Sequence, residues 1–81
     1  MGYHKQVIRK GILGDFSKVE EEIQELQDAK AQGAKILILC ELSDLYGAIN
    51  HYLKKHHNLE MEDIKKMSEL TEEAFKDGSR K

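Results

Sequence analysis

Residues 18–49 read KVEEEIQELQDAKAQGAKILILCELSDLYGAI, and their pattern predicts two consecutive helices. It holds two acidic pairs, Glu22 with Glu25 and Glu41 with Asp44, each spaced i, i+3. On an α-helix this spacing puts both carboxylates of a pair on one side. Two such helices, packed antiparallel across the Gln-Gly turn between them, bring four carboxylates together. A cluster of this kind repels itself unless a cation lies within it, and oxygen ligands suit Mg²⁺ or Mn²⁺.

The second acidic pair lies on an apolar helix face. On a helical wheel drawn at about 100° per residue, Glu41 lies between Leu37 and Leu45, and Asp44 lies at the border of the apolar face. A charge in that position is costly unless it is paired or bound to a metal. The sequence therefore carries acids where a purely structural helix pair would carry leucine.

The composition predicts one small helical domain that spans all 81 residues. Lys and Arg number 13 against 15 Asp and Glu, a net charge of −2. We therefore expect no nucleic-acid partner, since the chain lacks the positive excess that such binding requires. No signal peptide is visible, and no apolar run is long enough to span a bilayer. We expect a cytoplasmic protein with no membrane partner.

The apolar run ILILC at residues 36–40 fits either a buried strand or a helix. We interpret it as helix, because the helical phase continues beyond it. Cys40, the single cysteine, is then expected to be a reduced core residue. Gly47, which costs about 1 kcal/mol relative to alanine inside a helix, indicates a close helix contact, room for a ligand, or a tolerated glycine.

We predict an all-α fold made of a short N-terminal arm, an antiparallel helical hairpin and a third helix. The arm covers residues 1–15 and carries the basic residues His4, Lys5, Arg9 and Lys10. These residues either meet an anionic ligand or lie in solvent while the apolar residues of the arm pack on the core. The helices are expected at residues 17–31, 34–57 and 60–76.

Local signals mark the expected helix ends. Ser17 and Glu20 form a capping-box pattern, and Phe16 before them is expected to pack on the core. Gly33 and Asn58 are expected to end the first and second helices, since both tolerate the left-handed conformation. The third helix repeats apolar residues at helical spacing, which predicts ordinary core packing. These residues are Met61, Ile64, Met67, Leu70, Ala74 and Phe75.

The acids form an E-E-x-x-E motif at residues 21–25 and an E-x-x-D motif at residues 41–44. This pair of motifs resembles the signature of the MazG-like all-α nucleoside triphosphate pyrophosphohydrolases. The resemblance covers about residues 17–53. The RKGxxGDFSK opening at residues 9–18 and the FxxGxR segment at residues 75–80 are similar to small phage and bacterial MazG-like proteins.

The resemblance implies a Mg²⁺-dependent house-cleaning hydrolase. Such an enzyme cleaves a nucleoside triphosphate between the α and β phosphates and releases the monophosphate and pyrophosphate. By motif position, Glu22, Glu25, Glu41 and Asp44 would bind Mg²⁺ or Mn²⁺. Glu21 would either orient or deprotonate the attacking water or only support the neighbouring ligands.

Basic residues near the acids are expected to contact the substrate. Lys18, Lys54 and Lys55 would steady the phosphates, or are simply surface lysines. His51 lies about 20° from Asp44 on the wheel, two turns along. It therefore reaches substrate or a nearby water, or is a partly buried histidine without a ligand.

The chain is short for this family, so we expect the base pocket to be built between subunits or to be incomplete. A homodimer or homotetramer would complete the MazG-like helical bundle. The alternative is a non-enzymatic helical module that binds a nucleotide or a protein through the same scaffold. Convergence of the carboxylates beside an open cleft favours the enzyme, whereas their neutralisation by lysine and arginine favours the alternative.

Overall fold

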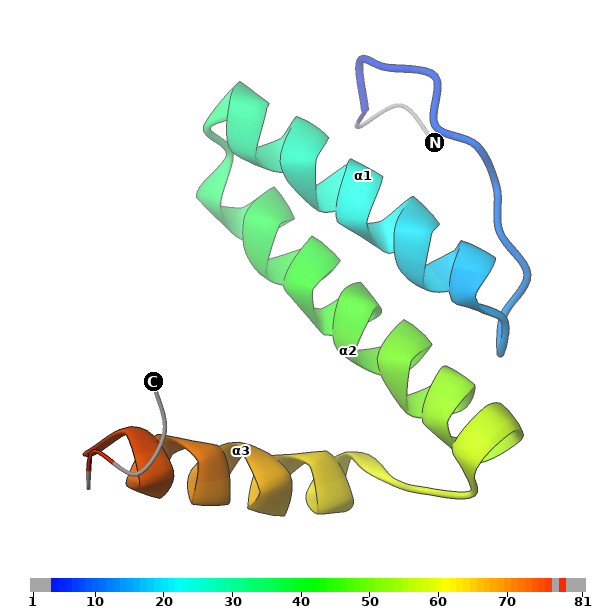
Figure 1. The fold of residues 1–81 in the computed structure, drawn as a ribbon. Coiled ribbons are helices and arrows are strands. Elements are labelled where there is room, and N and C mark those ends of the chain that lie inside the picture. The colour runs from blue at the N-terminus through cyan, green and yellow to red at the C-terminus, as the bar shows by residue number, and fades with distance from the viewer. Residues whose placement is uncertain (1–3, 77, 79–81) are drawn as a thin grey trace.

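The computed structural model describes residues 4–76 and 78, and these form three helices and no strand. They are α1 (Phe16–Gln32), α2 (Lys35–His57) and α3 (Met61–Lys76). α1 and α2 run antiparallel as a hairpin, and the arm returns along α1 (Figure 1). The all-α prediction is confirmed. Residues 1–3 of the expected arm and Arg80 of the FxxGxR segment lie outside the described residues.

Two residues with positive φ end the hairpin helices. Gly33 ends α1 with φ 69°, and its N–H donates to the Lys30 carbonyl oxygen at 3.0 Å. Asn58 ends α2 with φ 52°. Both predicted helix ends are confirmed, because a left-handed residue stops the helix and turns the chain. None of the described helices is long and apolar enough to cross a membrane.

The start of α1 differs from the predicted capping box. The Ser17 hydroxyl accepts a hydrogen bond from the Ile12 N–H at 3.1 Å, and α1 has no side-chain cap. The capping-box prediction is therefore wrong, because the arm takes the hydroxyl. Asp15 precedes the helix and accepts hydrogen bonds from Lys55 at 2.8 Å and His56 at 3.4 Å, which lower its pKa. These contacts join the start of α1 to the end of α2.

The apolar core between α1 and α2 is narrow. Among residues 4–76 and 78, the buried apolar side chains are Val19 and Ala29 from α1 and Ala48 and Leu53 from α2. Two of the four are alanines, whose small side chains let the helix backbones approach closely. The hairpin therefore buries little apolar surface within one chain.

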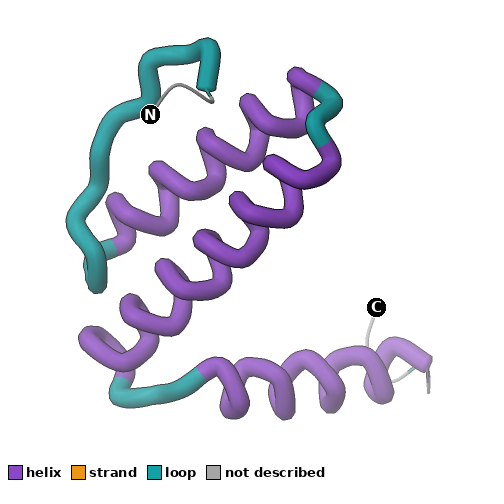
Figure 2. Tube along the Cα trace, turned by 180° about the vertical axis from the view of Figure 1, so that it is seen from behind, coloured by secondary structure: helices purple, strands orange, loops and turns teal. Residues whose placement is uncertain are grey.

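Several residues expected in the core are exposed. Cys40 is exposed, and Phe16 is 54% exposed and makes an edge contact with Tyr52. No described residue of α3 is buried, and Met67 and Leu70 are 59% and 66% exposed. These predictions are wrong for the single chain. The apolar residues of α3 are exposed because α3 leaves the hairpin and contacts little of α2 (Figure 2).

The arm is attached through polar contacts. Val7, Ile12 and Leu13 are exposed, so the alternative in which the apolar residues of the arm pack on the core is wrong for these three, while Ile8 is half-buried. Instead, the Gly11 N–H donates to Glu21 Oε1 at 2.8 Å. A Cβ at Gly11 would lie 2.3 Å from the Ser17 carbonyl oxygen, so only glycine permits this close approach.

We expect Gly11→Ala to loosen the arm, because the new methyl group would overlap the backbone at Ser17. Overpacking of this kind costs about 1–3 kcal/mol. Gly47→Ala is the matched control, since a Cβ there meets nothing within 4 Å. This change should stabilise α2 by about 1 kcal/mol, because alanine favours a helix interior over glycine. Hydrogen exchange of the arm amides should accelerate in Gly11→Ala only. Equal protection in both variants would contradict the close contact.

Candidate metal centre

Four acids from the two hairpin helices meet between them. Glu22 and Glu25 lie on α1, Glu41 and Asp44 lie on α2, and one carboxylate oxygen of each lies within 4.8 Å of the others. The antiparallel hairpin brings them together, because each i, i+3 pair faces the other helix. Glu22 and Glu41 are buried, Glu25 is half-buried and Asp44 is exposed. The carboxylate cluster, as we call these four residues, is therefore closed at one end and open at the other.

Two oxygens of the carboxylate cluster lack the partners that buried polar atoms need. Oε2 of Glu22 and Oε2 of Glu41 are buried and accept no hydrogen bond. Leaving a buried acceptor without a partner costs about 1–3 kcal/mol, and more when it is charged. Burial raises the pKa of Glu22, and burial together with the neighbouring Glu41 raises the pKa of Glu25. The carboxylate cluster without a cation thus works against folding.

The donor atoms of the carboxylate cluster suit a hard divalent cation. Mg²⁺ and Mn²⁺ prefer carboxylate and water oxygens, and Mg²⁺ usually keeps several waters. The two buried oxygens without partners supply donors at the closed end. The exposed Asp44 leaves the other end open to water or to a ligand. The residues present therefore fit Mg²⁺ or Mn²⁺.

Glu21 is buried but lies outside the carboxylate cluster. Its Oε1 accepts hydrogen bonds from the Gly11 N–H at 2.8 Å and from Lys18 Nζ at 3.2 Å, and its Oε2 lies 3.7 Å from Lys10 Nζ. Burial raises the pKa of Glu21, but these donors outweigh it and hold the pKa below its ordinary value. Of the two roles that the resemblance implies, the contacts favour support of neighbouring residues.

Lys18 connects Glu21 with the carboxylate cluster. Its Nζ lies 3.2 Å from Glu21 Oε1 and 3.2 Å from Glu22 Oε1. Burial lowers the pKa of Lys18, but the hydrogen bonds to both glutamates outweigh it and raise the pKa, so the ammonium stays charged. Within residues 4–76 and 78, Lys18 and His4 are the basic side chains that pair with the four acids. Basic residues therefore neutralise the carboxylate cluster only in part.

An open cleft of about 900 Å³ lies beside the carboxylate cluster. Three of the acids line it, Glu25, Glu41 and Asp44, together with His4 and Lys10 from the arm. Its apolar lining residues are Ile8, Ala34, Ile36, Leu37 and Cys40. The cleft thus combines acidic, basic and apolar surfaces.

A smaller cleft of about 370 Å³ opens on another side of the acids. It is lined in part by Lys18, Glu22, Asp44, Gly47 and His51. A Cβ built at Gly47 would meet no atom within 4 Å. Of the roles expected for this glycine, the structure therefore favours room for a ligand over a close helix contact. Asp44 lines both clefts and so lies where they meet.

The predicted substrate contacts lie in different places. Lys18 and His51 line the smaller cleft, but His51 is exposed, so the expectation of partial burial is wrong. Lys54 and Lys55 line neither cleft. Lys55 pairs with Asp15 at 2.8 Å, and Lys54 lies 4.0 Å from a carboxylate oxygen of Glu60. The structure therefore brings Lys18 to the acids but not the other two lysines.

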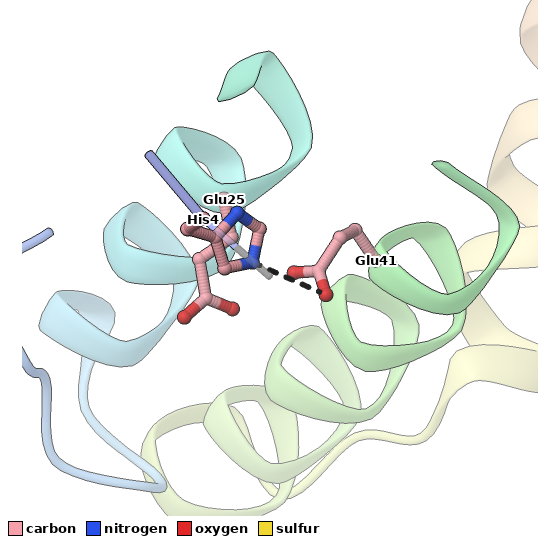
Figure 3. Close-up of side chains that lie close together, drawn as sticks. All are labelled: His4, Glu25 and Glu41. Carbon is pink, nitrogen blue, oxygen red and sulfur yellow. Dashed lines mark ion pairs between the residues drawn. The ribbon is translucent and has the colours of Figure 1, made fainter. Parts of the chain in front are cut away.

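Two further residues adjoin the acids. His4 Nδ1 lies 2.8 Å from Asp28 Oδ2, and His4 Nε2 lies 3.7 Å from Glu41 Oε1 (Figure 3). Burial lowers the pKa of His4, but the hydrogen bond to Asp28 and the charges of Glu41 and Glu25 outweigh it and raise the pKa. Asp28 continues the i, i+3 series of Glu25, a signal that would have identified it. No local signal shows where the arm folds back.

Comparison with protein-family models, with curated proteins and with solved structures gave no match.

We expect Glu25→Gln to stabilise the metal-free protein at pH 8. The change removes one of four repelling charges, and the new amide can donate to Glu41. Folding raises the pKa of Glu25, so the ionised carboxylate destabilises the folded protein. This destabilisation is absent below the unfolded pKa of about 4.3 and is complete above the folded pKa. A gain of about 1 kcal/mol, or about 4 °C in Tm, should therefore vanish near pH 4.

Thermal unfolding in EDTA at both pH values measures this effect. Glu20→Gln, at an exposed position on α1, is the matched control and should change little at either pH. A Glu25→Gln protein no more stable than the control at pH 8 would show that the carboxylates do not repel one another appreciably.

Proposed function

We propose that this protein is a Mg²⁺-dependent nucleotide pyrophosphohydrolase, which cleaves a nucleoside triphosphate to the monophosphate and pyrophosphate. One observation carries the proposal. Glu22, Glu25, Glu41 and Asp44 converge within 4.8 Å, and two of their oxygens are buried without partners. The resemblance of the two acidic motifs to the MazG-like enzymes supports the same activity and the same four ligands.

The carboxylate cluster would hold the metal from two helices. When bound, Mg²⁺ neutralises phosphate charge and lowers the pKa of a coordinated water. The buried Glu22 and Glu41 supply oxygens that no other described group satisfies. The exposed Asp44 lies where the two clefts meet, which gives a phosphate access to the carboxylate cluster.

The larger cleft suits a nucleotide. Its volume of about 900 Å³ lies within the range of about 300–1,000 Å³ that is usual for small-molecule sites. Ile8, Ile36 and Leu37 offer apolar surface for the nucleoside, and three of the four acids line the same cleft. Lys10 lines this cleft and Lys18 lines the smaller one, where their ammonium groups would be available to the phosphates.

Glu21 acts through its neighbours in this proposal. It accepts from the Gly11 N–H and from Lys18, so it holds the arm and a phosphate-binding lysine in position. Its lowered pKa keeps the carboxylate ionised, as these hydrogen bonds require. Glu21 thus orients the side chains around the reacting phosphates without itself belonging to the carboxylate cluster.

Pyrophosphate release from a panel of canonical and modified nucleoside triphosphates, with Mg²⁺ or Mn²⁺, tests the proposal. Glu41→Gln should reduce the rate at least about a hundredfold, because a metal ligand supplies several kcal/mol of transition-state stabilisation. Glu20→Gln should leave the rate unchanged, since that side chain is exposed and outside both clefts. The nucleotide from which pyrophosphate is released fastest identifies the preferred base.

Circular dichroism of Glu41→Gln separates loss of the site from loss of the fold, and Glu25→Gln provides a second ligand variant. Folded wild-type protein that binds Mg²⁺ but releases pyrophosphate from no member of the panel would refute the enzyme. That result would favour the second candidate, a nucleotide- or protein-binding module. Exposed apolar residues on α2 and α3, such as Leu39 and Leu70, provide a surface for such binding.

We also propose that the chain acts as a homodimer or homotetramer, with a second copy covering exposed apolar residues. Four buried apolar side chains among residues 4–76 and 78 make a small core for a chain of 81 residues. Meanwhile Leu39, Leu42 and Tyr46 are exposed on one side of α2, and Met67 and Leu70 are exposed on α3. Association of identical chains would bury both surfaces.

Leu70→Glu should weaken self-association at least about tenfold, because burial of a leucine side chain contributes about 1.5–3 kcal/mol. Lys65→Glu, at another exposed position of α3, is the matched control and should change the dissociation constant little. Sedimentation equilibrium over a concentration series measures both constants. A wild-type chain that stays monomeric throughout would exclude the oligomer.

A further inference from the structure

His4 lies between two acids from different helices. Its Nδ1 lies 2.8 Å from Asp28 Oδ2, and its Nε2 lies 3.7 Å from Glu41 Oε1. An ionised carboxylate only accepts hydrogen bonds, so Nδ1 must donate to Asp28. In the neutral imidazole, Nε2 then carries a lone pair and faces the acids, as Figure 3 shows for Glu25 and Glu41.

Asp28 is built to hold this ring. It is only 3% exposed, and its Oδ2 also accepts hydrogen bonds from Gln32 Nε2 at 2.8 Å and from the Lys5 N–H at 3.2 Å. The hydrogen bond from His4 lowers the pKa of Asp28, which keeps the carboxylate ionised. Histidines that bind metals generally donate their other N–H to a carboxylate or carbonyl in this way, which fixes the tautomer and the ring orientation.

The other nitrogen of His4, Nε2, lies near carboxylate oxygens that are candidate metal ligands. A nitrogen of His4 and one oxygen each of Glu25 and Glu41 lie within 4.8 Å of one another. The 3.7 Å between Nε2 and Glu41 Oε1 is too long for a hydrogen bond. Two ligands that each lie about 2.1 Å from one ion are about 3.4 Å apart at a tetrahedral angle, so the two atoms would need to approach by only a few tenths of an ångström to share an ion. Glu41 also contributes its buried Oε2, which has no hydrogen-bond partner.

We propose that His4 is a nitrogen ligand, which joins Glu25 and Glu41 in binding a divalent transition-metal ion such as Mn²⁺ or Co²⁺. The inference rests on the metal site of the proposed function and adds a ligand from the N-terminal arm. Glu25 and Glu41 belong both to the carboxylate cluster and to the group that includes His4. The ion would therefore have a nitrogen ligand when the arm is docked and oxygen ligands only when it is not. An imidazole ligand favours Co²⁺ over Mg²⁺, since Mg²⁺ prefers oxygen.

The test uses the full chain with Mn²⁺, Co²⁺ and Mg²⁺ as probes. Electron spin echo spectra of bound Mn²⁺ should carry the modulation of an imidazole nitrogen, and His4→Gln should abolish it. Calorimetry should show His4→Gln weakening Co²⁺ binding at least about tenfold and Mg²⁺ binding far less. His57→Gln, which changes an exposed histidine at the far end of α2, is the matched control and should preserve the nitrogen signal.

Three results would overturn the inference. Bound Mn²⁺ without nitrogen modulation would leave the carboxylate site of the proposed function intact and remove His4 from it. A nitrogen signal that survives His4→Gln but disappears in His51→Gln would assign the ligand to the smaller cleft. Wild-type protein that binds none of the three ions would overturn both this inference and the metal-dependent function.

Discussion

The hairpin brings four carboxylates together in spite of their mutual repulsion, and the other contacts of the fold must offset this cost. α1 and α2 approach closely because small apolar residues, Ala29 and Ala48, lie between them. The same approach buries Glu22 and Glu41 with oxygens that have no partner. A helix pair selected for stability alone would carry apolar residues there. In the proposed function, a cation bound by these carboxylates would offset this cost, so the stability of the hairpin and the proposed metal site would be linked.

Adjacent glutamates on α1 have opposite electrostatic environments. Glu21 receives hydrogen bonds from the arm and from Lys18, and its pKa is lowered. Glu22, one residue on, faces α2, and burial raises its pKa in spite of the same lysine. A helix turns by about 100° per residue, so neighbouring side chains meet different surfaces. This difference separates the residue that anchors the arm from the residues that would bind metal.

Periodicity predicted the features that arise within one helix or between sequence neighbours. Gly33 and Asn58 end their helices as expected, and the i, i+3 acids converge once the hairpin forms. The features that sequence patterns missed are long-range. The arm takes the Ser17 hydroxyl from the expected cap, and His4 bonds to Asp28 across 24 positions. Burial on α3 was predicted from its apolar periodicity, which identifies an apolar side but not what covers it.

The arm and the hairpin are held by different forces, and this has a consequence for how the molecule responds to its ionic surroundings. The arm leaves Val7 fully exposed and is joined to α1 largely by charged groups, such as Lys10 with Glu21 and His4 with Asp28. Dissolved ions screen contacts between exposed charges, but they screen buried pairs much less and do not weaken apolar burial in this way. Rising salt therefore weakens the pair between Glu21 and Lys10, whose side chain is 79% exposed, whereas the buried Asp28 keeps its hydrogen bonds to His4 and to the Lys5 N–H.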